Sequence, residues 1–320
     1  MVTNFWIGLK RPILTLAPLA NVTDCAFRQM VAKYGKPSVL WTEFISADGL
    51  AHPRGREKLL IDLQFSSNER PIVAQFFGAQ PENIRAAAAL AVKLGFDGVD
   101  INMGCPDRAV ERQGAGAALI KNPSLAQAII RAAQEGSGGL PVSVKTRLGY
   151  QHNELDTWLP ALLETEPAAV TIHARTRKQM SKVPADWGAI ARAVAIRDQL
   201  GSKTLILGNG DLDDPRSART KVATSGADGA MLGRAIFGRP WLFNDQFVPT
   251  PNERLRIARE HTALFQQMLG QVKNFEQMRK HFRLYITGWN GASELRRQLL
   301  ETRTAEAALH LLDTYPQPII

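Results

Sequence analysis

Cys105 is the residue of this chain whose type and surroundings most clearly suggest chemistry. The apolar run Gly98–Asn102 stops at a polar residue, and Cys105 then follows between Gly104 and Pro106. Most cysteines in proteins are small buried hydrophobes. A thiol in a Gly/Pro turn just beyond a strand end, followed by the small-residue segment 113–117, is poorly placed for core packing. It is well placed to exchange a proton with a substrate.

Polar or charged residues also close the other apolar runs of the chain. In sequence order these run ends carry Pro18, Glu43, Gln75, Asn102 with Cys105, Lys145 with Arg147, His173 with Arg175, Asn209-Gly210-Asp211, and Gly233-Arg234. Each of these residues alone is weak evidence for a functional site, since a single histidine, for example, is more often structural than catalytic. Their recurrence at the close of every apolar run predicts one shared site. In that site, Lys145 and Gln75 are expected to contact the polar edge of a flat heterocycle.

The elements that must position these residues alternate regularly between strands and helices. The expected strands are 13–17, 39–44, 72–77, 98–102, 142–147, 169–173, 204–208 and 229–232, and the expected helices begin near 24, 81, 122, 154, 186 and 213. The strands are nearly continuous apolar runs, as strands covered on both faces are. Pro, Asn or Asp mark the helix starts. The pattern predicts an α/β fold, a (β/α)8 TIM barrel, whose catalytic residues lie at the C-terminal strand ends.

The last two strand loops are small and rich in glycine. Gly208–Asp211 follows the seventh strand, and Gly233-Arg234 follows the eighth and leads into an expected helical turn over 235–241. Barrels often bind phosphate at these loops, where backbone N–H groups and a helix N-terminus favour an anion. A phosphate-bearing cofactor is therefore indicated. A phosphorylated metabolite, with Lys145 as an imine-forming lysine, remains the alternative.

The pattern changes after about residue 245. Val248–Pro251 indicates a linker, and 252–313 contains three or four helical runs and no strand-like run. We therefore expect a TIM-barrel domain over residues 1–245, followed by a small C-terminal all-helical domain over 252–320.

Composition limits the class of protein. With 320 residues and 45% hydrophobic content, the chain can form one barrel and a small appendage. Cys25 and Cys105 are the two cysteines, which disfavours a disulfide framework and a cysteine-based zinc site and favours the cytoplasm. We expect no metal, no secretory signal and no membrane segment. The net charge of +9 attracts polyanions without identifying one, and a merely solvated basic surface explains it equally well.

A series of motifs gives the chain a family resemblance over residues 12–243. The motifs are Ala17–Asp24, Phe27-Arg28, Thr42-Glu43, Gln75–Gly78, Asp100–Pro106, Gly114–Leu119, Val144–Gly149, Ile172–Arg177, Gly208–Asp211 and Gly226–Arg234. In their order and spacing the chain resembles the tRNA-dihydrouridine synthases. The segments Met278–Tyr285 and Gly291–Arg296 resemble the helical RNA-binding domain of the bacterial B-type branch. Three departures are Leu19 to Asn21, where the family has Met-x-Gly, Ala174, where glycine is common, and the segment 179–185, which lacks the family's frequent aromatic residue.

The resemblance implies an FMN-dependent reduction of the C5=C6 bond of a uridine in tRNA, with NADPH as the reductant. The implied cofactor-binding residues are Pro18, Leu19, Ala20, Gln75, Lys145, His173, Asn209, Gly210, Asp211, Gly233 and Arg234. Hydride passes to C6, and Cys105 protonates C5 as the general acid. A thiol with an ordinary pKa near 8.5 is mostly protonated at neutral pH, as this role requires. Asn102, Arg147, Arg175 and Arg177 are implied to hold the base or its flanking phosphates.

The implied substrate also agrees with the basic charge. A uracil in folded tRNA must be flipped out to reach a barrel mouth, at a cost of about a few kcal/mol, which basic contacts along the backbone must offset. Three basic residues of the C-terminal region, Arg279, Lys280 and Arg283, lie within about one helical turn of each other. We expect them to contribute to these contacts with the tRNA backbone. A solvated basic face is the alternative reading of these three residues.

Two other functions stay open at this point. One is an FMN-dependent reductase of a free pyrimidine, similar to a dihydroorotate dehydrogenase, against which the basic helical tail argues. The other is a non-catalytic tRNA-binding folding helper, against which Cys105, Lys145 and His173 argue. For the favoured function we expect a cytoplasmic monomer with tRNA as its partner.

Overall fold

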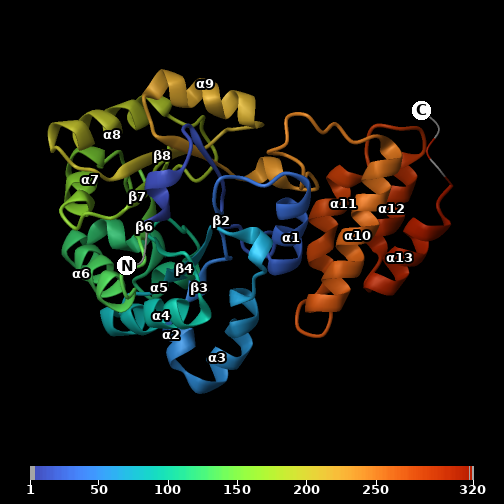
Figure 1. Cartoon of the computed structure of the whole chain (residues 1–320), viewed down its shortest axis with the longest axis horizontal. Coiled ribbons are helices and arrows are strands. Elements are labelled where there is room, and N and C mark those ends of the chain that lie inside the picture. The colour runs from blue at the N-terminus through green and yellow to red at the C-terminus, as the bar shows by residue number, and fades with distance from the viewer. Residues whose placement is uncertain (1–3, 317, 319–320) are drawn as a thin grey trace. The chain divides into compact units, whose positions relative to one another are not determined.

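A ring of parallel strands between residues 13 and 232, surrounded by helices, is the first main feature of the structure (Figure 1). The computed structural model describes residues 4–316 and 318. The strands are β1 (Ile13–Leu16), β2 (Leu40–Trp41), β3 (Ile45–Ser46), β4 (Ile72–Phe77), β5 (Gly98–Asn102), β6 (Val142–Arg147), β7 (Ala169–His173), β8 (Leu205–Asn209) and β9 (Gly229–Leu232). Their order is β1-β9-β8-β7-β6-β5-β4-β2, with β3 paired to β4. A parallel bridge between Thr15 and Val39 joins the two ends, so the expected barrel is confirmed.

The second barrel strand is the one that differs from expectation. The sequence predicts one strand over 39–44, whereas the structure has the two short strands β2 and β3 with an irregular segment between them. Within that segment, the Thr42 hydroxyl accepts a hydrogen bond from the Gln75 N–H at 3.0 Å and donates to the Glu43 carbonyl at 2.8 Å. The side-chain hydroxyl thus takes the place of a backbone acceptor, and the ladder is interrupted there.

The helices between the later strands start and end close to the expected residues. They are α4 (Pro81–Leu94), α6 (Pro123–Gly136), α7 (Leu155–Leu163), α8 (Trp187–Gln199) and α9 (Pro215–Ser225). The side chains of Asn122, Asp186 and Asp214 cap the first turns of α6, α8 and α9 by accepting backbone N–H groups. Gly95 and Gly226 end α4 and α9 in the left-handed conformation, with φ of 79° and 71°.

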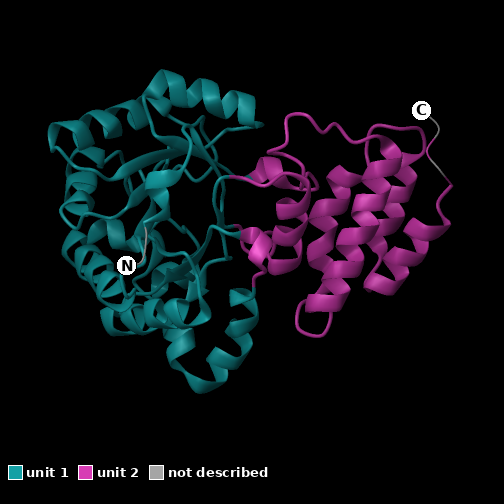
Figure 2. Cartoon of the chain, viewed as in Figure 1, with its two compact units in different colours: residues 1–18, 38–64, 70–233 teal, residues 19–37, 65–69, 234–320 magenta. Residues whose placement is uncertain are grey.

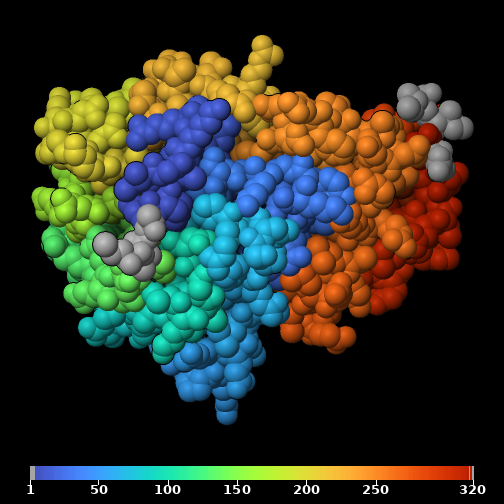
Figure 3. Space-filling view, viewed as in Figure 1, coloured from blue at the N-terminus to red at the C-terminus, as the bar shows by residue number. Residues whose placement is uncertain are grey.

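Three short helices after the second and fourth barrel strands were not expected. They are α2 (Ala47–Ala51) and α3 (Pro53–Leu59), which follow β3, and α5 (Arg108–Arg112), which follows β5. No residue of α3 is buried, and this helix projects from the edge of the molecule (Figures 1 and 3). The expected helical turn over 235–241 is only a 3₁₀ turn at Arg234–Ile236.

The chain divides into two compact units (Figure 2). Unit 1 comprises residues 1–18, 38–64 and 70–233, and unit 2 comprises residues 19–37, 65–69 and 234–320. This division differs from the expected boundary between 245 and 252, because α1 (Cys25–Tyr34) and residues 234–245 group with the C-terminal helices. The reason is packing: the Phe27 ring lies 5.1 Å from the His261 ring and 4.2 Å from the His281 ring.

The C-terminal part of unit 2 is helical, as expected. Its α-helices are α10 (Pro251–Leu269), α11 (Arg279–Tyr285), α12 (Ala292–Glu301) and α13 (Ala305–Thr314). Thr250 and Glu253 form a capping box, which places the start of α10 at the end of the expected linker.

Candidate active site

The polar strand ends of unit 1 lie on adjacent strands at one end of the barrel. The parallel register pairs Asn102 with Lys145, Arg147 with His173, and His173 with Asn209. The carboxyl ends of barrel strands meet at the same face, where barrel enzymes place their active sites. The structure therefore brings these residues together.

Gln75, Asp100 and Asn102 form a buried network beside this face. Gln75 Nε2 donates to Asp100 Oδ2 at 2.6 Å, and Gln75 Oε1 accepts from Asn102 Nδ2 at 3.0 Å. Burial raises the pKa of the Asp100 carboxyl to about 6, against hydrogen bonds from Ser143 and Gln75 that lower it. Asp100 thereby fixes the orientation of the Gln75 amide, a role that the sequence analysis did not assign.

The turn that carries Cys105 is held from several sides. Asn102 Oδ1 accepts hydrogen bonds from the Gly104 N–H at 3.1 Å and from the Cys105 N–H at 2.9 Å. Arg147 Nε donates to the Gly104 carbonyl at 2.7 Å. Gly116 has a φ of +61°, and a Cβ at this position would lie 2.7 Å from the Cys105 carbonyl oxygen. Asn102 and Arg147, both expected at the substrate, thus also hold the turn.

The Cys105 side chain is half-buried and packs beside Phe44, Phe77, Val110 and Ala115. Burial is the main cause of a raised pKa of the Cys105 thiol, which outweighs the lowering by the backbone of Asp107 and by nearby cations. The thiol is therefore protonated at neutral pH. A thiol in this state can act as an acid, but it is a weak nucleophile.

Lys145 stands next to Asn102 in the register. Its Nζ donates to Asn209 Oδ1 at 3.4 Å, and Asn209 Nδ2 donates to the Met231 carbonyl at 2.7 Å. Burial, followed by the charge of Arg147, lowers the pKa of Lys145 to about 8. The ammonium is thus charged at neutral pH, although its long hydrogen bond compensates little of its desolvation.

Arg175 and Asp211 are paired with each other. Arg175 is 3% exposed, and one guanidinium nitrogen lies 2.6 Å from each Asp211 carboxylate oxygen. A second guanidinium nitrogen lies 3.3 Å from His173 Nε2, and Nε donates to the Val183 carbonyl at 2.6 Å. These contacts join the loops that follow β7 and β8.

Arg177 is likewise engaged within the protein. Its Nε donates to Glu111 Oε1 at 2.8 Å, a second guanidinium nitrogen contacts Glu111 Oε2, and the guanidinium lies 5.5 Å from the centre of the Tyr150 ring. Glu111 is on α5, so this ion pair links the loop after β7 to the helix that follows Cys105.

The expected phosphate loops have different surroundings. Gly210 has a φ of +127°, and a Cβ there would lie 2.9 Å from Ala185 Cβ, so a close approach requires glycine at this position. A Cβ on Gly233 would have only Ala17 Cβ within 4 Å, at 3.9 Å. The backbone at Gly233 is therefore uncrowded where a Cβ would stand, beside Ala17 in unit 1, and it is joined in sequence to Arg234.

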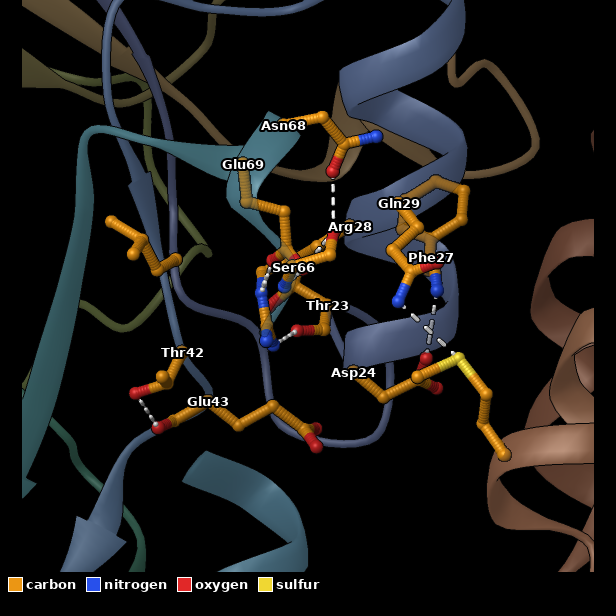
Figure 4. Close-up of polar contacts among 12 residues, drawn as sticks. Thr23, Asp24, Phe27, Arg28, Gln29, Thr42, Glu43, Ser66, Asn68 and Glu69 are labelled. Carbon is orange, nitrogen blue, oxygen red and sulfur yellow. Dashed lines mark hydrogen bonds and ion pairs between the residues drawn. The ribbon is translucent and has the colours of Figure 1, made fainter. Parts of the chain in front are cut away.

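Leu19 and Ala20 belong to unit 2, where a buried ion pair holds their segment (Figure 4). Arg28 Nε lies 2.7 Å from Glu69 Oε2, and both side chains are fully buried. Arg28 also donates to the Thr23 carbonyl at 2.9 Å, and the Thr23 hydroxyl accepts from the Leu19 N–H at 2.9 Å. The sequence analysis quoted Arg28 in a motif and missed Glu69, whose partner lies 41 residues away.

The three basic residues expected to bind RNA lie on α11. Arg279 pairs with Glu276 at 3.2 Å and donates to the Thr302 carbonyl at 3.4 Å. Lys280 and Arg283 are exposed. Arg279 is therefore engaged within the protein, whereas Lys280 and Arg283 are exposed to solvent.

The described residues contain neither a metal-binding cluster nor a membrane-spanning helix. Within residues 4–316 and 318, no group of three or more His, Cys, Asp or Glu side chains is arranged to hold a metal ion. Among the same residues, no helix has the length and apolar character needed to cross a membrane.

The fold and the site together define an enzyme built on a (β/α)8 barrel. The family model for dihydrouridine synthase matches residues 15–319, and the chain belongs to this family. The chain is 41% identical over 318 residues to a probable tRNA-dihydrouridine synthase of Staphylococcus aureus (strain COL), covering 98% of this chain and 96% of that protein. It is 39% identical over 318 residues to probable tRNA-dihydrouridine synthase 2 of Bacillus subtilis (strain 168), covering 98% and 97%. The resemblance found in the sequence is confirmed.

Solved structures agree on the fold. A complex of 2-naphthoyl-CoA reductase has a TM-score of 0.54 at 12% identity, covering 72% of this chain and 49% of that chain. Histamine dehydrogenase from Rhizobium sp. 4-9 has a TM-score of 0.52 at 12% identity, covering 79% and 49%. At this identity the likeness concerns the architecture.

Proposed function

We propose that this chain reduces a uridine in tRNA to 5,6-dihydrouridine, with FMN as cofactor and NADPH as reductant. The observation that carries the proposal is the Cys105 thiol, which has a raised pKa and sits on a firmly held turn at the strand ends. A protonated thiol is the state that can donate a proton to C5 of a pyrimidine. Family membership supports dihydrouridine synthesis in tRNA as the reaction.

The residues at the strand ends fit a flavin with a phosphate group. Lys145 presents a cation whose one hydrogen-bond partner among the described residues is Asn209, and the backbone at Gly233 is uncrowded, with only Ala17 Cβ of the described residues within 4 Å of an added Cβ. The proposed cofactor-binding residues are Pro18, Leu19, Ala20, Gln75, Lys145, His173, Asn209, Gly210, Asp211, Gly233 and Arg234. Because the carboxylate of Asp211 pairs with Arg175, we assign its contribution to the backbone. Bound FMN supplies the hydride that reaches C6 of the uracil.

The protein itself handles the proton. Cys105 Sγ–H donates its proton to C5, and the resulting thiolate takes a proton back from solvent before the next turnover. Asn102 keeps the turn in place through Oδ1, while its second Nδ2 hydrogen has no partner among the described residues and is available to the base.

The arginines expected at the substrate take two kinds of role. Arg147, Arg175 and Arg177 hold the loops around the base, because each has carbonyl or carboxylate partners within the protein. In the helical domain over 252–320, we assign tRNA backbone contact to Lys280 and Arg283, with Arg279 supporting the helix that carries them. The cytoplasmic location and the monomeric state remain predictions.

The test is reduction of unmodified tRNA by the purified protein with FMN and NADPH, with dihydrouridine measured by mass spectrometry of nucleosides. We expect dihydrouridine in tRNA and none from free uridine or orotate. Turnover of free orotate would instead support the reductase of a free pyrimidine. A protein that binds tRNA, gains no flavin absorbance on titration with FMN and forms no dihydrouridine would support the folding helper.

A further inference from the structure

The two arginines of the loop after β7 do not provide uncompensated charge for a polyanion. Arg175 pairs with Asp211 and Arg177 pairs with Glu111, so both guanidinium groups already face a carboxylate. A protein that neutralises RNA phosphates needs cations whose charge is not already neutralised. Such cations must therefore come from other residues, either the exposed Lys178 and Lys182 of the same loop or another element at the barrel mouth.

Helix α5 is the element that lies nearest to Cys105 along the chain. It begins three residues after the cysteine, and its Val110 is buried in the cluster that also includes Phe77 and Cys105. Arg108 and Arg112 are both exposed. Residues four apart lie on the same face of a helix, and Val110, between them, lies on the other. Because Val110 packs toward Cys105, both arginines lie on the opposite, outward face of α5.

The carboxylates of α5 and of its N-cap are engaged with groups other than these two arginines. Asp107 accepts backbone N–H groups at the helix start, and Glu111 is neutralised by Arg177. Among residues 4–316 and 318, neither Arg108 nor Arg112 has an ion pair or a side-chain hydrogen bond. The exposed face of α5 therefore presents two positive charges about one helical turn apart.

We propose that Arg108 and Arg112 bind the phosphates that flank the reacting uridine of the tRNA. The proposal rests on the proposed function and names the group that holds the flipped nucleotide at Cys105. Extruding a base from its stack costs about a few kcal/mol, and cation contacts to the adjacent phosphates offset this cost. Because Val110 fixes α5 beside Cys105, phosphates bound on α5 direct the base toward the thiol.

The test compares three double variants. Arg108→Ala/Arg112→Ala removes both charges, and Arg108→Lys/Arg112→Lys keeps them. The matched control Arg216→Ala/Lys221→Ala removes two exposed charges from α9. Binding of unmodified tRNA is measured over a series of salt concentrations, together with KM and kcat for dihydrouridine formation. Thermal unfolding verifies that each variant is folded.

For the alanine pair we expect the plot of log affinity against log salt to flatten by about 1.4 to 1.8, as two lost phosphate contacts imply. We also expect KM for tRNA to rise at least about tenfold, with a smaller change in kcat. The lysine pair and the α9 control should keep the wild-type slope. An alanine pair with the wild-type slope, or an equal flattening in the α9 control, overturns the proposal.

Failure of the proposed function is a separate result. If the wild-type protein binds tRNA but forms no dihydrouridine, the reaction is wrong. The salt slopes of the alanine pair and its control still decide whether Arg108 and Arg112 contact the RNA.

Discussion

Among single residues, Cys105 combines a partly exposed side chain with a thiol that keeps its proton. Asn102 and Arg147 contact the backbone of the turn through Gly104 and the Cys105 N–H. These contacts position the residue while the apolar wall of Phe77 and Val110 desolvates the sulfur and raises its pKa. A turn held through its backbone thus leaves the thiol available as an acid.

Replacing Cys105 tests this role directly. Cys105→Ala should slow the reduction of tRNA by about 10²- to 10⁴-fold, the usual loss when a general acid is removed. Reduction of bound flavin by NADPH needs no proton at C5 and should continue, which stopped-flow absorbance can follow. Wild-type turnover of tRNA by this variant would contradict the assignment.

The charge of Lys145 provides a second prediction. Its pKa of about 8 means that the free enzyme loses this cation as the pH rises through 8. If the cation holds the flavin, FMN affinity should be at least about threefold weaker at pH 9 than at pH 7, where the FMN phosphate is already a dianion, as measured by flavin fluorescence. In Lys145→Arg the charge persists at pH 9, because arginine does not deprotonate in proteins, and the pH dependence should disappear.

Among the structural elements, the segment 19–23 depends most clearly on distant contacts. Glu69 pairs with Arg28, and Arg28 in turn holds the Thr23 carbonyl. Arg28 and Glu69 are fully buried, so each leaves an uncompensated charge if the other is removed. Because Arg28 also holds the Thr23 carbonyl, the pair determines the local conformation next to Leu19 and Ala20.

Glu69→Gln should therefore lower the free energy of unfolding by about 3 to 5 kcal/mol, as measured in urea, and should weaken FMN binding. The neighbouring exposed residue offers a matched control, and Asn68→Ala should change both quantities little. If the glutamine variant is as stable as the wild type and binds FMN equally well, the ion pair does not hold this segment.

At the scale of the whole molecule, unit 2 contains a buried pair of histidines. The rings of His261 and His281 lie 4.8 Å apart, and the exposed fractions of the two residues are 0% and 2%. Burial lowers both pKa values, that of His281 to about 3, whereas an unfolded chain has a histidine pKa near 6.5. The unfolded state binds more protons between these values, so stability falls as the pH decreases from 6.5 toward 3.

For His281 alone, this difference lowers the free energy of unfolding by about 2 kcal/mol at pH 5. Urea unfolding at pH 7.5 and at pH 5 should show that the wild type loses about 2 kcal/mol more than His281→Asn does. An equal loss in the two proteins would mean that His281 does not cause the acid sensitivity.

The second prediction at this scale concerns the exposed basic residues of α11 and their contribution to tRNA binding. Lys280→Ala/Arg283→Ala should flatten the salt dependence of tRNA affinity by about 1.4 to 1.8, because both side chains are exposed. Arg279→Ala should instead lower thermal stability and leave the salt slope nearly unchanged, since Arg279 contacts Glu276 and the Thr302 carbonyl. An unchanged slope in the double variant would mean that these charges are only a solvated face.

The sequence by itself determined the barrel, most strand and helix limits, the helical tail and the position of Cys105. These features depend on short-range signals: apolar runs, capping residues, and polar residues at the strand ends. Motifs in the order and at the spacing of the family then pointed to the dihydrouridine synthases, because such motifs reflect what the local backbone must do around a ligand.

The tertiary structure alone decided which charged residues face one another. Arg175 meets Asp211 across 36 residues, Arg177 meets Glu111 across 66, and Arg28 meets Glu69 across 41. It also decided that the second strand is interrupted at Thr42 and that α1 packs with the C-terminal helices. Such pairings depend on how distant segments pack, and the periodicity of a sequence carries no information about the partner of a buried charge.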